Sequence, residues 1–97
     1  MIVRMIHVQV PEGERETAHQ MWKEHCAPLM ISSPGCLSEE LLACREAPGE
    51  MISISTWESD TEIDAYRDSE AHHDIQMRTR ELLKGAQATV KTYEAVA

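Results

Sequence analysis

The sequence predicts an α+β protein built on one antiparallel sheet. Four segments alternate with the period of two typical of strands, two carry apolar residues at helical steps, and their order is strand, helix, strand, strand, helix, strand. Two strand–helix–strand units with right-handed crossovers form a four-stranded antiparallel sheet with both helices on one face, the ferredoxin-like arrangement. The 97 residues match the usual size of one domain, so we expect residues 1–97 to form a single domain.

The first strand is expected at residues 2–10, where a more apolar set of side chains alternates with a more polar one. The more apolar set is Ile2, Arg4, Ile6, Val8 and Val10. A helix is expected at residues 14–31, because apolar residues recur there at three- and four-residue steps. Pro28 lies inside this pattern. Its missing N–H and the clash of its ring with the Glu24 carbonyl predict a kink or an early end of the helix.

The middle of the chain has the pattern of a β-hairpin followed by a second helical region. Residues 37–44 alternate weakly, and residues 51–57 have the Ile, Ser, Thr and Trp content of a partly buried strand. Ser59 and Glu62 have the spacing of a capping box, in which the hydroxyl accepts a free N–H and the carboxylate reaches back. The helical region that begins there is expected to bend at residues 68–70, and residues 89–96 alternate as a last strand.

Charge and cysteine content exclude several classes of partner. With 9 Lys and Arg against 17 Asp and Glu, the net charge is −8, which argues against nucleic acid and anionic membrane surfaces. No apolar run approaches the roughly 18 residues of a membrane span, and we expect a cytoplasmic protein. The three cysteines have no disulfide or zinc spacing. His19 and His25 do not share a helix face, so with Cys26 they predict no metal site.

A small core and a bare sheet face predict self-association. The chain has four aromatic residues and no Phe, which leaves few large side chains to fill a core. Because both helices cover one face of the sheet, the other face is open, and strand parity is expected to place Met5, Met51 and Trp57 on it. An open apolar face of this kind normally marks a partner surface. We therefore expect a homodimer that packs sheet on sheet.

The most specific stretch joins the third strand to the second helical region. It carries Trp57, Ser59, Ile63, Tyr66, Ser69, His72 and His73. With this spacing, and with Pro34-Gly35 before the second strand and Tyr93 in the last, the sequence resembles the antibiotic biosynthesis monooxygenase superfamily. The members of that superfamily are small dimeric α+β barrel proteins. The resemblance extends in element order and length over nearly the whole chain.

The resemblance implies a cofactor-independent monooxygenase that acts on a small aromatic or quinol-type substrate, with no cofactor. His72 and His7 are then the candidate proton acceptors, since the free pKa of histidine lies near operating pH. Adjacent helical residues point about 100° apart, so only one of His72 and His73 faces the cavity, and His72 is favoured. The residues expected to bind substrate between the sheet and the second helical region are Ser53, Trp57, Tyr66 and His73.

The sequence also fits other interpretations. Trp57 also fits a core or interface residue, and Tyr66 a boundary residue. The haem-degrading members of the superfamily carry a tryptophan, a histidine and an asparagine where this chain has Tyr66, Gln76 and His7, so haem degradation is disfavoured. The alternative of another class is a non-enzymatic dimer that binds a small hydrophobic ligand or has a structural role.

Overall fold

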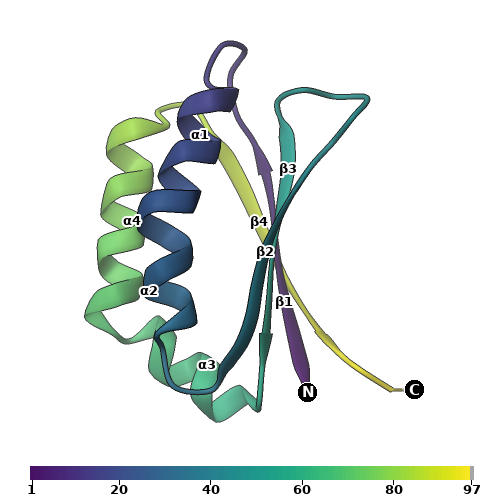
Figure 1. Ribbon diagram of the computed structural model, residues 1–97, viewed down its shortest axis with the longest axis vertical. Coiled ribbons are helices and arrows are strands. Elements are labelled where there is room, and N and C mark those ends of the chain that lie inside the picture. Colours follow the sequence, from purple (N-terminus) through teal and green to yellow (C-terminus); the bar gives the residue numbers. More distant parts are fainter. Residues whose placement is uncertain (97) are drawn as a thin grey trace.

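A four-stranded antiparallel sheet is the base of the fold. In the computed structural model, which describes residues 1–96, the strands are β1 (Ile2–Gln9), β2 (Cys36–Ala43), β3 (Glu50–Trp57) and β4 (Gln87–Glu94). They lie in the order β2-β3-β1-β4, and each strand is antiparallel to its neighbours. The helices all cover one face of this sheet, and the other face is open (Figure 1). The predicted ferredoxin-like α+β fold is confirmed.

The first helical region consists of three segments with different hydrogen bonding. These are α1 (Arg15–Met21), the π-helical η1 (Trp22–Cys26) and α2 (Ala27–Ile31). In η1 the Ala27 N–H donates to the Trp22 carbonyl, five residues back. Of the predicted kink or early end at Pro28, the early end is wrong: the chain stays helical to Ile31, with Pro28 in the first turn of α2 directly after the π-helical η1. The helix thus passes Pro28 through a wider, π-helical turn and does not break.

The second helical region divides at the predicted bend into α3 (Asp60–Arg67) and α4 (Glu70–Leu82). The predicted capping box is wrong in its bonding, because the Ser59 hydroxyl bonds the Glu62 carboxylate and caps no backbone N–H. Ser69 is the side chain that caps, since its Oγ accepts from the His72 N–H at 3.2 Å. This bond fixes the first turn of α4. The last strand begins two residues earlier than predicted, at Gln87.

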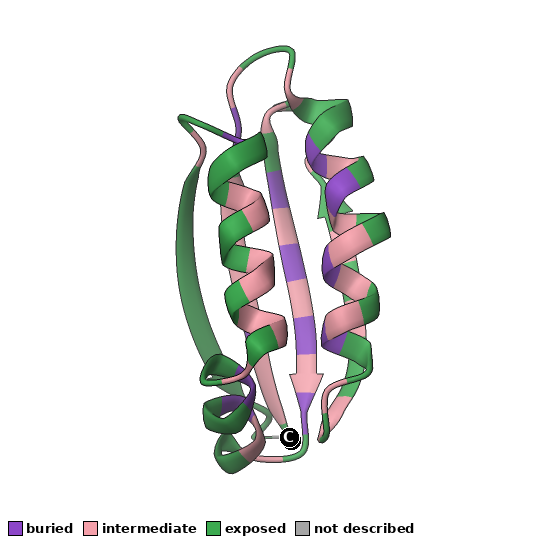
Figure 2. Ribbon diagram, turned by 90° about the vertical axis from the view of Figure 1, so that its left-hand side faces the viewer, coloured by how far each residue is buried: buried purple, intermediate pink, exposed green. Residues whose placement is uncertain are grey.

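Strand register decides which side chains face the helices. Arg4 lies opposite Ser55, and Ile6 opposite Ser53, so the apolar set of β1 shares the covered face with the buried residues of β3. Those residues appear as alternating buried bands along the central strand in Figure 2. Met51 and Trp57 are among them, at 3% and 0% exposed, so the expectation that they lie on the open face is wrong. Met5 does lie on the open face, opposite Ile54.

Two apolar clusters fill the space between sheet and helices. One lies under α1 and η1, and the other surrounds Trp57 near α3. Strand β4 is different, because all of its residues are exposed (Figure 2). Within residues 1–96, no helix combines the length and the apolarity needed to cross a bilayer.

Candidate functional site

A cavity of about 480 Å³ lies between the sheet and the two helical regions. Its floor is formed by helix-facing residues of β1 and β3, and its walls by η1 and α4. Most of the lining is apolar, including Ile6, Met21, Leu41 and Ile75. An apolar cavity of this size, lined by few polar groups, is typical of small-molecule sites. The polar groups at its surface therefore decide its chemistry.

His72 lines this cavity from the first turn of α4. Its Nδ1 lies 3.1 Å from the carbonyl oxygen of Arg67. Because a carbonyl only accepts, this hydrogen bond requires the proton to be on Nδ1, and Nε2 of the neutral ring is then a free base. Burial, and next the positive charge of Arg4, lower the pKa of His72. The ring is therefore neutral at pH 7.

Tyr66 separates the cavity from the deepest aromatic residue. Its ring lies 4.9 Å from the Trp57 ring and 5.0 Å, edge on, from the His72 ring. Trp57 is fully buried behind it, and the indole N–H of Trp57 donates to Ser55 Oγ at 2.9 Å. Burial raises the pKa of the Tyr66 phenol, which stays protonated. Tyr66 forms part of the cavity lining, and Trp57 supports it from beneath.

Arg4 is a cavity residue that was not among the predicted site residues. It is only 5% exposed, it lines the cavity, and its Nη1 has no hydrogen-bond partner among residues 1–96. Its guanidinium carbon lies 5.8 Å from the centre of the Tyr66 ring, within cation–π range. Burial lowers the pKa of Arg4, but a guanidinium stays charged in proteins. The cavity floor thus carries a positive charge.

Two cavity residues, Ser53 and Trp22, are hydrogen-bonded to Glu39 of β2, which does not itself line the cavity. Ser53 Oγ and Trp22 Nε1 both donate to Glu39 Oε1, at 2.8 and 3.1 Å. Burial raises the pKa of Glu39 to about 7, against the lowering effect of these two hydrogen bonds. Ser53 was predicted as a site residue, whereas Trp22 and Glu39 were not. The position of Trp22 among the apolar residues of the first helix could have indicated that it faces the sheet.

The other predicted site residues lie elsewhere. The placement of His7 in the cavity is wrong: it pairs with Ile52 and shares the open face with Met5, because side chains alternate strictly along β1. His73 is exposed, one position round the helix from His72. Of the predicted residues, therefore, the structure brings Ser53, Tyr66 and His72 together at one cavity.

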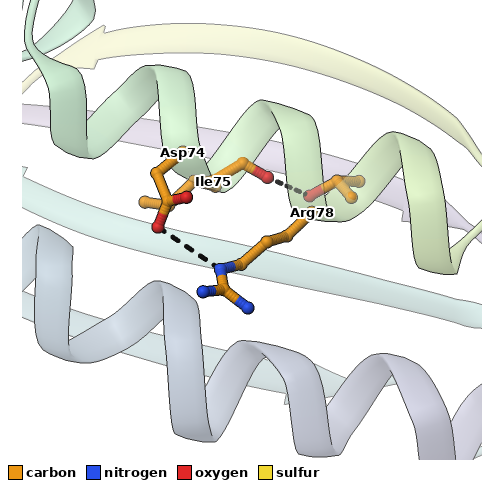
Figure 3. Close-up of polar contacts among 4 residues, drawn as sticks. Asp74, Ile75 and Arg78 are labelled. Atoms are coloured by element: carbon orange, nitrogen blue, oxygen red, sulfur yellow. Dashed lines mark hydrogen bonds and ion pairs between the residues drawn. The ribbon is translucent and has the colours of Figure 1, made fainter.

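Two further groups near the cavity are inert. Cys26 lines it, but burial raises the pKa of this thiol to about 11, so it is not a thiolate at pH 7. The hydroxyl of Thr79 donates to the Ile75 carbonyl at 2.8 Å, as the close-up of α4 shows (Figure 3). Asp74 and Arg78 pair at 3.3 Å, and both side chains are about half exposed, which limits this pair to about 0.3–0.5 kcal/mol.

Replacing Arg4 by methionine is expected to raise the free energy of unfolding by about 1–3 kcal/mol, because a buried charge without an ionic partner costs desolvation that a buried thioether does not. Urea denaturation would measure this. Arg4→Lys is the control, since it retains the charge and should give no such gain. A less stable Arg4→Met variant would contradict the inference that the buried charge of Arg4 costs stability.

Comparison with known proteins identifies a family. Residues 1–78 match the family model described as Antibiotic biosynthesis monooxygenase. No match is found among curated proteins.

Within residues 1–96, no group of three or more His, Cys, Asp or Glu side chains is arranged to hold a metal ion.

Many solved structures share the fold at low sequence identity. A candidate antibiotic biosynthesis monooxygenase from Deinococcus radiodurans has a TM-score of 0.86 and 14% identity over 100% of this chain and 94% of its own. One from Nitrosomonas europaea has a TM-score of 0.84 and 11% identity over 100% of both chains. A variant of SnoaB, a cofactor-independent oxygenase from Streptomyces nogalater, has a TM-score of 0.82 and 14% identity over 99% of this chain and 94% of its own.

Proposed function

Because the chain belongs to the antibiotic biosynthesis monooxygenase family, we propose that it is a cofactor-independent monooxygenase acting on a small aromatic or quinol-type substrate. The observation that carries this proposal is a neutral His72, with Nε2 as its free base, beside the buried cation of Arg4 in an apolar cavity. The likeness in fold to SnoaB, a cofactor-independent oxygenase, supports it.

His72 and Arg4 have complementary tasks in this mechanism. His72 Nε2 accepts the proton of the substrate hydroxyl, and the Arg4 guanidinium stabilises the oxyanion that remains. The electron-rich ring then reacts with dioxygen at a ring carbon that carries hydrogen. One oxygen atom stays on that carbon as a carbonyl oxygen, and the other leaves as water with the two hydrogens from the O–H and C–H bonds. The substrate supplies the electrons that reduce both oxygen atoms.

The apolar walls serve the same reaction. Loss of the hydroxyl proton creates charge, and the Arg4 cation acts on that charge more strongly where water is excluded. The Tyr66 ring, held by Trp57 at 4.9 Å, offers the substrate ring a rigid surface beside His72. A planar aromatic ligand fits such a surface better than a flexible chain does.

We further propose that two copies pack their open sheet faces together. That face carries partly buried Met5 and Ile54. Leu42 and Tyr93, which are 42% and 46% exposed, extend it to the outer strands. Apolar side chains spread over all four strands are typical of a surface that is covered in the assembled state. A sedimentation mass of one chain at micromolar concentration would contradict this arrangement.

Oxygen consumption tests the proposed activity. Purified protein is expected to accelerate oxygen uptake by at least one member of a panel of phenols, naphthols and quinols, with saturation as substrate rises. With ¹⁸O₂, one labelled atom is expected in the product. Heat-denatured protein is the control for uncatalysed oxidation. No uptake with any reduced aromatic, together with measurable binding of the same compounds, would favour the non-enzymatic ligand-binding dimer.

A further inference from the structure

Three polar side chains from three separate elements are joined at one wall of the cavity. Trp22 of η1 and Ser53 of β3 line the cavity, and both are bonded to Glu39 of β2, which does not line it. Ser53 Oγ donates to Glu39 Oε1 at 2.8 Å. The Trp22 indole N–H donates to the same oxygen at 3.1 Å and to Ser53 Oγ at 3.3 Å. One carboxyl oxygen therefore links the first helical region to the sheet.

The carboxyl group of Glu39 is enclosed by the protein. Its Oε2 is shielded from solvent and has no hydrogen-bond partner in the described part of the chain. The ion pair found within residues 1–96 is that of Asp74 with Arg78, so no cation contacts the Glu39 carboxylate directly. An enclosed carboxylate without an ionic partner is costly to ionise. Glu39 therefore takes up a proton at a higher pH than an exposed glutamate does.

The protonation state of Glu39 determines how firmly it holds Trp22. Burial raises the pKa of Glu39 to about 7, and the hydrogen bonds from Ser53 and Trp22 act in the opposite direction. A hydrogen bond that lowers the pKa of a carboxyl group is, by linkage, stronger to the ionised form. Charge-assisted hydrogen bonds are roughly twice as strong as neutral ones. The Trp22 indole is thus held more firmly above pH 7 than below it.

The charged and titratable groups that act on Glu39 keep their charge near neutral pH. They are Arg4 of β1, Cys26 of η1, Cys36 of β2 and Tyr66 of α3. Arg4 stays positive and favours the ionised form of Glu39. Burial raises the pKa of Cys26 to about 11 and also raises the pKa of Cys36 and of Tyr66, so all three stay protonated. A transition near pH 7 in this network therefore belongs to Glu39.

We propose that Glu39 is a positioning residue whose ionisation holds the Trp22 indole in the cavity wall and so tightens the binding of an aromatic ring. This inference rests on the proposed function, because it assigns to that cavity a control of ligand binding by pH. Trp22 is the first residue of the π-helical η1, and π-helical turns recur at functional sites. The position of Trp22 affects affinity and KM, whereas kcat depends on His72.

The ligand-free protein provides the first test. Its two tryptophans give two indole N–H signals in a ¹H–¹⁵N spectrum, and Trp22→Phe identifies the signal of Trp22. This signal is expected to shift with pH with a midpoint of about 7, whereas that of Trp57 should not. Glu39→Gln should abolish the transition, and Glu40→Gln, at the exposed neighbouring residue, should retain it. A Trp22 signal that does not move near pH 7, or that moves equally in Glu39→Gln, would overturn the proposal.

Binding of 1-methoxynaphthalene provides the second test, because this ligand has no ionisable proton. Its dissociation constant for the wild-type protein is expected to be about 2–5-fold larger at about pH 6 than at about pH 8. Glu39→Gln keeps an acceptor oxygen without the charge, so it should have the weaker, acidic-pH affinity at both pH values. Glu39→Leu has no acceptor and should bind more weakly still. Calorimetric titration would measure these constants, and equal wild-type affinities at the two pH values would overturn the proposal.

A double-variant cycle separates positioning through Trp22 from a general structural effect. Trp22→Phe keeps a ring but has no N–H to donate to Glu39. Adding Glu39→Leu to Trp22→Phe is therefore expected to cause no further loss of affinity, and fully additive losses would overturn the proposal. Circular dichroism would establish that each variant is folded.

The role of Glu39 and the proposed activity fail independently in this design. The indole titration needs neither ligand nor oxygen. If Trp22 titrates with Glu39 and the protein consumes no oxygen with any aromatic, the positioning role is retained and the oxygenase activity is contradicted. If oxygen uptake is normal and the Trp22 signal does not titrate, the positioning role is overturned and the oxygenase activity is retained.

Discussion

Replacing His72 by alanine is expected to lower kcat/KM for an accepted aromatic substrate by about 10²–10⁴-fold, the usual contribution of a general base. His72 lines the cavity, and its Nε2 is the free base because the Arg67 carbonyl, 3.1 Å from Nδ1, holds the ring proton there. Tyr66 is no substitute, because burial raises the pKa of its phenol and keeps it protonated. Initial rates of oxygen uptake would measure the loss.

The pH dependence of the wild-type rate distinguishes a base from a merely structural residue. Burial lowers the pKa of His72, so the active, neutral ring persists below the ordinary histidine pKa of about 6.5. The acidic limb of the rate profile is therefore expected to have its midpoint below pH 6.5. In His72→Gln the residual rate is expected to lack this acidic limb.

His73→Ala is the matched control, because His73 is exposed on the next position of the same helix. It is expected to keep wild-type activity and the wild-type pH profile. Full activity of His72→Ala, or an equal loss in His73→Ala, would contradict the assignment of the base to His72.

Replacing Trp57 by alanine is expected to reduce the free energy of unfolding by about 3–5 kcal/mol, which is a large part of the total for a domain of this size. Trp57 is 0% exposed, and its ring packs at a tilt against that of Tyr66, with the ring centres 4.9 Å apart. Its removal leaves a void beneath the wall of the cavity. Urea denaturation, followed by circular dichroism, would measure the change.

Trp57→Phe separates packing from hydrogen bonding at the same position. It keeps a buried ring next to Tyr66 but loses the N–H that donates to Ser55 at 2.9 Å. A smaller loss of about 1–2 kcal/mol is expected, since one net hydrogen bond and a few contacts are removed. If Trp57→Ala were as stable as the wild type, Trp57 would have to face an open space, contrary to its burial.

Much of the fold could be predicted because strands and helices leave periodic patterns along the chain. The predictions that proved wrong concern features that leave no local pattern in the sequence. A proline inside an apolar stripe predicts a break, yet the π-helical turn before Pro28 keeps the chain helical to Ile31. Parity assigns a strand residue to one of two faces, but which face the helices cover depends on packing between distant segments. That is why Met51 and Trp57 were expected on the wrong side.

The cavity could be predicted only in part for the same reason. Tyr66 and His72 lie on the α3–α4 region that carries the most specific motif, and the structure places both at the cavity. Their roles stay predictions. Arg4 alternates with the apolar residues of β1, where a charged side chain looks like a break in the pattern. Its role as a cavity residue depends on the helices that cover this face, which the local sequence does not reveal. Glu39 acquires its surroundings from Ser53 and Trp22, 14 and 17 residues away in the sequence.

The two edges of the sheet bear on how copies of the chain can join. On one edge, β2 has a register irregularity between Cys36 and Ser38 and carries the exposed charge of Glu40. On the other, β4 presents Lys91. A bulge breaks the even spacing of free backbone groups, and a charge on an edge strand opposes a neighbouring strand. Both edges therefore resist the addition of strands from another copy, so the proposed dimer would join through the open face and not by extension of the sheet.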